Sequence, residues 1–270
     1  MIHAESGAEA RAGAGAEADA LAAELRAAGT PDRATSEKAY LKSDLEFFGT
    51  GVPAIRAMVR SWCRARPALA HAELVAVAAA LWKCPVHERR MAAQMLLIQN
   101  TALLGSADIP LVEQMLREAR TWALVDSLAA DLMGTLVERD PELTPVLDRW
   151  ASDGDFWIRR SALLPLLLPL RRGGGDFERF SRYADQMLAE KEFFIRKAIG
   201  WVLRETAKKR PALVAAWLEP RIGQLSGVTL REALKPLPPD LRAALLAARL
   251  SPDYCERHAP PATWIRALFC

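Results

Sequence analysis

Long hydrophobic runs are missing from this sequence of 270 residues, although 51% of the residues are hydrophobic. No window reaches the roughly 18 uninterrupted apolar residues that a membrane-spanning helix needs. The opening stretch MIHAESGAEARAGAGAEADA has none of the basic, apolar and cleavage regions that mark a signal peptide. We therefore expect a cytosolic, cytoplasmic protein with no membrane partner.

Cysteine and histidine are both scarce, with four residues of each. The cysteines form no C-x-x-C pair, and the histidines are just as scattered. This spacing excludes the usual zinc and disulfide patterns and favours reduced, mostly buried thiols. We expect no metal and no cofactor.

Net charge is also low, at +3 for the whole chain, but it is unevenly distributed. Residues 1–30 carry five acids and two bases, whereas residues 193–235 hold nine Lys and Arg against three Glu. A basic segment of this kind favours a polyanionic partner, although a solvated helix face has the same composition.

Strand signals are nearly absent, and apolar residues recur at helical spacing through most of the chain. Six segments can be laid in register: PAIRAMV, HERRMAA, LVDSLA, WIRRSAL, FIRKAIG and TLREALK. Their aligned central residues are Arg56, Arg90, Asp126, Arg160, Lys197 and Arg231. Successive spacings are 34, 36, 34, 37 and 34 residues. The sequence therefore contains an internal helical repeat.

A period of about 35 residues with two helices is typical of an α-solenoid of the HEAT or TPR kind. We predict an all-α, C-shaped α-solenoid of about six HEAT-like two-helix repeats with a basic concave face. Residues 1–18 are expected to be a disordered leader, 19–241 the repeat domain, and 242–270 a C-terminal appendage.

Stacked repeats bring equivalent positions alongside one another, so the six aligned residues should form a ladder with five cations and one acid. Ladders of this kind often bond between neighbouring repeats and only hold the stack together. A basic stripe would also follow a DNA backbone, with each cation neutralising a phosphate. The sequence leaves both interpretations open.

The chain has few aromatic residues, 7% in all, but eight of them are tryptophan. Most tryptophans in helical repeats are core residues, and we expect this of Trp62, Trp82, Trp150 and Trp217. Trp122 lies four residues before Asp126, and Trp201 lies four residues after Lys197. Both should therefore project from the face of the charged ladder, where apolar rings beside cations suggest a cleft for a sugar or base.

Several longer segments carry a resemblance beyond the repeat pattern. YLKSDLEFFGTGVPAIRAMVRSW, LWKCPVHERRMAAQML, TWALVDSLAADLMG, DFWIRRSALL and EKEFFIRKAIGWVLRETAKKRP resemble the AlkD family of bacterial DNA alkylation repair glycosylases over about residues 35–236. The resemblance implies HEAT-like repeats that form a basic groove around duplex DNA. The leader and the tail are where this sequence departs from the family.

The resemblance also assigns residues. It places the catalytic tryptophan and aspartate on Trp122 and Asp126 in WALVD, and the active-site arginine on Arg160 in WIRR. The tryptophan of the IGWVLRE helix is Trp201, and the aromatic of the Y-x-K segment is Tyr40. We expect Asp126 to stabilise a cationic sugar and to orient water, and Arg160 to hold the lesion strand by a phosphate.

These observations predict a monofunctional glycosylase that releases N3- or N7-alkylated purines from double-stranded DNA. It would act as a monomer in base excision repair or in self-resistance to alkylating agents. Two alternatives remain: a noncatalytic HEAT-like scaffold for DNA structures, and a protein-interaction module. The expected DNA-binding residues are Tyr40, Arg56, Arg90, Lys197, Trp201, Arg204, Arg231 and Lys235.

Overall fold

The computed structural model describes residues 2–250, with side chains described from residue 13 onward. The predicted all-α fold is confirmed: no strand forms in this part of the chain, and only an isolated bridge pairs Glu46 with Val86. No helix among these residues is long and apolar enough to span a membrane. The chain divides into two compact units, Met1–Ser161 and Ala162–Cys270. The sequence had predicted a single repeat domain.

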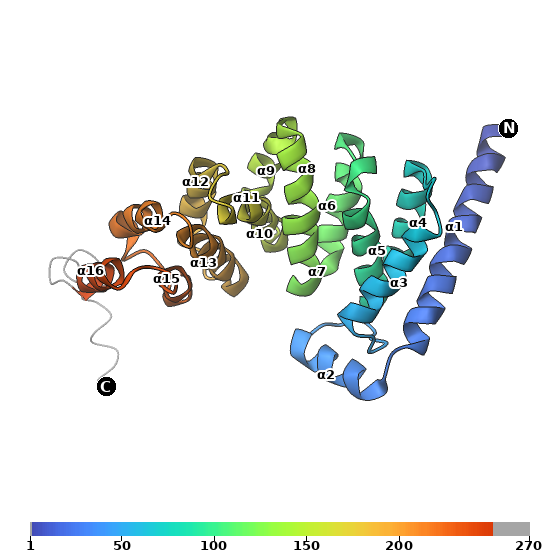
Figure 1. The fold of residues 1–270 in the computed structure, drawn as a ribbon, viewed down its shortest axis with the longest axis horizontal. Helices are drawn as coiled ribbons and strands as arrows, with labels where there is room; N and C mark the ends of the chain where they lie inside the picture. The colour runs from blue at the N-terminus through green and yellow to red at the C-terminus, as the bar shows by residue number, and fades with distance from the viewer. Residues whose placement is uncertain (1, 251–270) are drawn as a thin grey trace, which may run out of the picture. The chain divides into compact units, whose positions relative to one another are not determined.

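Unit 1 consists of helices that pack on near neighbours in the chain, such as α4 on α5 and α3 on α5 (Figure 1). Its helices are α1 (Ile2–Ala27), α2 (Pro31–Leu41), α3 (Val52–Arg64), α4 (His71–Lys83), α5 (His87–Gln99), α6 (Ile109–Ala119), α7 (Trp122–Asp126), α8 (Gly134–Arg139) and α9 (Thr144–Trp150). A π-helical segment, Ser127–Met133, joins α7 to α8. Helix α10 (Phe156–Leu163) contains the boundary between the units.

Unit 2 continues the helix-pair pattern, with α13 packed on both α11 and α15. Its helices are α11 (Leu167–Arg171), α12 (Phe177–Met187), α13 (Phe193–Ala207), α14 (Pro211–Leu218), α15 (Gly227–Leu234) and α16 (Pro239–Leu250). Gly200 lets α13 approach α15 closely, because a Cβ there would lie 2.8 Å from the Cβ of Glu232. Helix α16 covers the start of the predicted appendage, and 251–270 lie outside the described residues.

The expectation of a disordered leader is wrong for the residues whose side chains are described. Helix α1 includes this stretch, and Ala14 and Ala18 are buried together with Leu21 and Leu25. These four residues recur every three or four positions, which gives α1 an apolar stripe that packs on α4. Alanine and glycine content suggested disorder, but alanine is also the strongest helix former.

Bonds between side chains one period apart confirm the repeat. The indole Nε1 of Trp82 donates to Glu118 at 2.9 Å across 36 residues, and that of Trp150 donates to Glu113 at 2.9 Å across 37. In unit 2, the indole Nε1 of Trp217 donates to Ser181 at 2.7 Å across 36 residues. These tryptophans are buried, as predicted, and so is Trp62.

Candidate active site

Trp122 and Asp126 are the first and last residues of α7, one helical turn apart. Leu124 and Val125 between them are fully buried, which turns the opposite face of α7 toward the core. Trp122 and Asp126 are each partly exposed. Burial of the neighbouring residues thus leaves one indole and one carboxylate together on the outer face of the helix.

Asp126 is held by Arg160 of α10. The Nε of Arg160 donates to Oδ1 of Asp126 at 2.8 Å, and its Nη2 donates to Oδ2 at 2.9 Å. The arginine side chain is 3% exposed and that of the aspartate 18%. A two-point contact of this kind fixes the plane of the carboxylate as well as its position. The two aligned positions therefore meet, and the carboxylate keeps some access to solvent.

An aromatic pair stands next to this carboxylate. The ring of Tyr40 meets that of Trp122 edge-on, with centroids 6.0 Å apart and planes at 85°. Tyr40 lies near the end of α2 and is 72% exposed, so burial does not explain its position. The four residues Tyr40, Trp122, Asp126 and Arg160 all belong to unit 1, and the structure brings them together.

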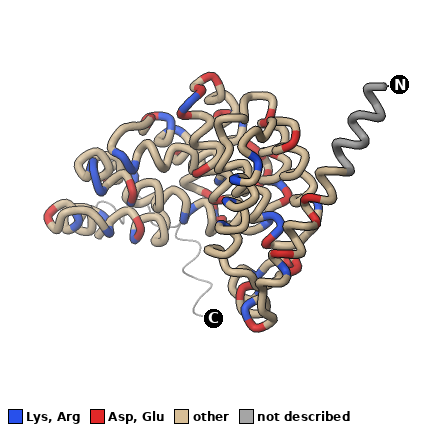
Figure 2. The backbone as a smooth tube through the Cα atoms, turned by 45° about the vertical axis from the view of Figure 1, so that its right-hand side comes forward, with Lys and Arg blue, Asp and Glu red and all other residues tan. Residues whose placement is uncertain are grey.

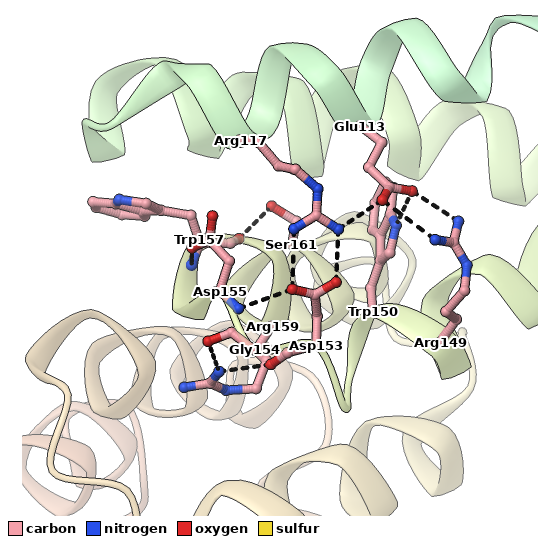
Figure 3. A network of polar contacts seen from close by, with 10 residues as sticks. All are labelled: Glu113, Arg117, Arg149, Trp150, Asp153, Gly154, Asp155, Trp157, Arg159 and Ser161. Atoms are coloured by element: carbon pink, nitrogen blue, oxygen red, sulfur yellow. Dashed lines mark hydrogen bonds and ion pairs between the residues drawn. The ribbon is translucent and has the colours of Figure 1, made fainter.

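The loop before α10 fixes the start of the helix that carries Arg160 (Figure 3). Oδ1 of Asp155 accepts a hydrogen bond from the backbone N–H of Trp157 at 2.8 Å, which caps the helix. Oδ1 of Asp153 in turn accepts from the N–H of Asp155 at 2.8 Å. The guanidinium of Arg159 closes the loop by donating to the carbonyl of Asp153 at 2.7 Å.

This loop is anchored to α6 by charge. The Nη2 of Arg117 donates to Asp153 at 2.7 Å and to Glu113 at 2.7 Å, as Figure 3 shows. Arg149 and Trp150 also donate to Glu113. Burial alone would raise the pKa of Glu113, but these hydrogen bonds outweigh it and lower the pKa to about 2. The bonds to Asp153 and Glu113 raise the pKa of Arg117.

The predicted cations of unit 1 lie in different environments. Arg56 is exposed on α3. Arg90 is buried: its Nε donates to the carbonyl of Trp82 at 3.3 Å and its Nη1 to that of Glu118 at 2.6 Å. It also lies over the Trp82 ring, 4.9 Å from the centroid. Contact of Arg90 with DNA stays a prediction, and its hydrogen bonds fit the alternative in which the ladder joins neighbouring helices.

In unit 2, three predicted DNA-binding cations converge on one buried carboxylate. Lys197 and Lys235 donate to Oε1 of Glu232 at 2.7 and 2.8 Å, and Arg204 donates to Oε2. Burial would raise the pKa of Glu232, but the bonds from Lys197 and Lys235 prevail and lower it to about 2. One acid thus offsets part of the positive charge that the sequence predicted for this helix face.

A second buried carboxylate, Glu205, collects further cations. Lys208 donates to it at 2.7 Å, and Arg171 and Arg204 are paired with it at 2.9 and 3.3 Å. Burial opposes ionisation of this acid, but the Lys208 hydrogen bond and the charge of Arg171 lower its pKa. Figure 2 shows basic and acidic residues interspersed along these helices. Several cations of the basic run are therefore paired with acids in a charge network.

The other predicted residues of unit 2 remain accessible. Arg231 is exposed on α15, and Trp201 is partly exposed on α13. Contact of these two residues with DNA stays a prediction, and so does contact of Tyr40 and Arg56 with DNA.

The acids that organise these cations were not predicted from the sequence. The Asp-x-Asp pair before α10 was a readable capping signal, since Asp is a preferred residue just before a helix. Glu113 and Glu232 carried no comparable signal, because they lie outside the aligned ladder positions. The π-helical segment after Asp126 was also missed, because its composition does not differ from that of an α-helix.

Comparison with known proteins agrees with this fold. A family model described as "DNA alkylation repair enzyme" matches residues 21–237. A solved structure described as a predicted DNA alkylation repair enzyme from Enterococcus faecalis is similar, with a TM-score of 0.71 and 23% identity; the match covers 78% of this chain and 97% of that one. No match was found among curated proteins.

Proposed function

The chain belongs to the DNA alkylation repair enzyme family, and on this premise we propose that it is a DNA glycosylase. Family membership supports a role in the repair of alkylated DNA. The finer proposal is that the protein hydrolyses the N-glycosidic bond of cationic N3- or N7-alkylated purines in duplex DNA. The observation that carries this proposal is a partly exposed carboxylate, Asp126, fixed beside the aromatic pair of Tyr40 and Trp122.

The chemistry explains why an acid is needed at this position. An N3- or N7-alkylated purine is already cationic, so it leaves without a strong general acid. The difficult part is the deoxyribose, which gains oxocarbenium character as the bond lengthens. A fixed carboxylate directed at this sugar lowers the barrier electrostatically and can orient the attacking water. An arginine, as found at the neighbouring aligned positions, would repel the developing charge.

Arg160 acts in this proposal by positioning Asp126. Its two hydrogen bonds fix the carboxylate before substrate arrives, so little reorganisation is needed during the reaction. The guanidinium is almost fully buried, which makes a positioning role simpler than direct phosphate binding. Phosphate binding by Arg160 would require the side chain to become more accessible than it is in this structure.

The aromatic residues would contact the sugar of the lesion. Electron-rich ring faces attract a nearby positive charge, and Trp122 with Tyr40 offers such rings beside the carboxylate. The same rings would exclude bulk water from the reacting bond. The dedicated pocket of a base-flipping enzyme is not required by this arrangement, so bulky adducts would be accepted as well as methyl groups.

A noncatalytic DNA scaffold is the second candidate, because the Asp126–Arg160 pair is also what a purely structural link between repeats looks like. The exposed Tyr40 and partly exposed Trp122 favour the enzyme, since neither ring position is needed to stabilise such a link. The two candidates differ in whether a base is released.

The test is product analysis on alkylated duplex DNA without added metal or nucleotide. We expect free 7-methylguanine or 3-methyladenine and an uncut strand that retains an abasic site. A parallel duplex with a bulky N7 adduct measures tolerance of adduct size. If the protein binds the duplex and no base is released, the scaffold function replaces this proposal.

A further inference from the structure

A cavity of about 500 Å³ lies in unit 1 where helices α2 and α6 end. Its charged lining residues are Lys42, Asp44, Arg90, Arg117, Glu118 and Arg120. Four of these side chains are cationic and two are acidic, so the lining is basic. This volume is in the range of ligand-binding sites, and it exceeds the space that a bare ion requires.

Two of the cations occupy unusual backbone positions. Lys42 follows α2 and Arg120 follows α6, and both have φ 49°, in the left-handed region. Glycine or asparagine adopts this conformation at lower cost than other residues, so it would be the ordinary choice at a helix end. At both ends the chain instead has a long cationic side chain that lines the cavity.

The positive charge in the cavity is only partly compensated. Arg117 is paired with Glu113 and Asp153, and Glu118 accepts hydrogen bonds from Trp82 and Gln114. Lys42 and Arg120 are exposed, and within residues 2–250 neither forms an ion pair. An anion bound there would meet two cations that need not break a bond inside the protein.

Arg90 adds a third charge at the wall of the cavity. Its donors are directed at two backbone carbonyls, which leaves its charge without direct contact to a carboxylate. Burial is the main cause that lowers the pKa of this arginine; Glu118 opposes the change, and repulsion from Arg120 adds to it. An anion between Arg90 and Arg120 would relieve this repulsion.

Two residues that line the cavity are close in sequence to residues of the candidate active site. Lys42 lies two residues after Tyr40, and Arg120 lies two residues before Trp122. The rings of Tyr40 and Trp122 are in contact, so the two cationic helix ends flank the aromatic pair that would hold the deoxyribose. In DNA, each deoxyribose carries a phosphate directly on its 3′ and 5′ oxygens.

We propose that this cavity binds one backbone phosphate of the lesion strand, next to the deoxyribose that packs on Trp122. The inference rests on the proposed glycosylase function. Arg120 contributes a planar fork suited to two phosphate oxygens, and Lys42 contributes a compact point charge. The bound phosphate sets the position of the sugar relative to Asp126.

The test is a coupling experiment between protein and DNA. The DNA is a duplex with one tetrahydrofuran abasic-site analogue, which fixes the binding register and is not hydrolysed. Individual phosphates around this site are replaced by neutral methylphosphonates. The variant K42N/R120N removes both cations and retains asparagine, which tolerates the left-handed conformation. The control R64N/R60N removes two exposed cations of α3 that do not line the cavity.

At one position, we expect a methylphosphonate to weaken DNA binding by the wild-type protein and by the control. The same methylphosphonate should not weaken DNA binding by K42N/R120N, which already lacks the two cations. The log–log salt dependence of duplex binding should also be shallower for K42N/R120N, by about 0.9 for each phosphate that the variant no longer neutralises. If the losses of binding caused by the methylphosphonate and by K42N/R120N are additive at every phosphate position, the proposal is overturned. A thermal shift with inorganic phosphate that K42N/R120N abolishes, together with an additive scan, would mean that the cavity binds free anions instead.

Glycosylase activity and the phosphate site can be tested separately. Base release with an additive scan leaves the glycosylase in place and removes the phosphate site. Coupling at one phosphate without base release retains the site and supports the scaffold function. Loss of all duplex binding would contradict both.

Discussion

In the proposed reaction Asp126 would interact with two positively charged groups, the guanidinium of Arg160 and the developing cation on the substrate sugar. A carboxylate has about four acceptor positions, and the two bonds from Arg160 occupy only one side of it. The remaining lone pairs are available to a water molecule or a cationic sugar. Arg160 therefore reduces the negative charge of the site but fixes its direction, which is the property that electrostatic catalysis needs.

His87 gives the protein a specific sensitivity to acid. Its ring stacks on Phe47 with centroids 4.7 Å apart, and burial lowers its pKa to about 4, while the charge of Glu37 opposes this change. Between pH 6.5 and 4 the unfolded chain binds a proton at this site that the folded protein does not bind. Stability should therefore fall as pH decreases through this window, by roughly 3 kcal/mol in total.

The check is denaturant unfolding from pH 7 to pH 4 for wild type and His87→Gln, which cannot bind this proton. The variant should lose less stability than wild type over this range, whatever its stability at pH 7. Glu113 and Glu232 have pKa values lowered to about 2, so their contribution is lost at lower pH, between 4.5 and 2. Parallel curves for the two proteins down to pH 4 would show that His87 is protonated in the folded state.

At the scale of elements, the candidate site depends on how two helices begin and end. The π-helical segment directly follows Asp126, and the carbonyl of Asp131 within it accepts a hydrogen bond from Thr135 at 2.7 Å. A π-helical turn contains more residues than an α-helical turn, so it shifts the following residues around the helix axis. The segment therefore changes the rotation of α8 about the helix axis relative to α7. The face of α7 that carries Trp122 and Asp126 and the buried face of α8 can then point in different directions.

Helix α10 depends on Arg117 and Asp153 for the position of its first turn. Asp153→Asn keeps the shape of this side chain but removes the charge that pairs with Arg117. We expect the variant to be destabilised by about 1–2 kcal/mol, since a hydrogen bond between charged groups is removed. We also expect slower base release at saturating protein, because Arg160 would hold Asp126 less firmly.

The matched control is Arg149→Gln, which removes another bond to Glu113 without touching Asp153. Its base-release rate should equal that of wild type even if its melting temperature falls. Equal rates for Asp153→Asn and Arg149→Gln, measured below both melting temperatures, would show that the network only stabilises the fold.

For the molecule as a whole, the sequence was sufficient to predict the helical repeat but not to predict which groups pair with its charged side chains. The period of about 35 residues was readable because each helix pair buries equivalent apolar positions. The environments of Lys197 and Arg90 were not readable, since they depend on Glu232 and on two carbonyls outside the aligned positions. A local pattern does not show which distant acid meets which cation.

In the candidate site too, local spacing was predictable from the sequence and distant partners were not. The residues Trp122 and Asp126 were predicted together because they lie one helical turn apart. Arg160 was predicted as a phosphate ligand. Its pairing with Asp126 corresponds to the other interpretation of the ladder, in which aligned residues of neighbouring repeats bond to each other. The division into two compact units was not predicted, because the helical pattern continues through residues 161 and 162.

A catalytic role for Asp126 is tested most directly by the single-turnover rate of 7-methylguanine release from duplex DNA by wild type and Asp126→Asn. Binding and circular dichroism are measured on the same samples, because the substitution changes the partner of a buried arginine. We predict that Asp126→Asn folds and binds DNA as wild type does and releases base about 10² to 10³ times more slowly. An Asp126→Asn protein that releases base at the wild-type rate would contradict a catalytic role for this carboxylate.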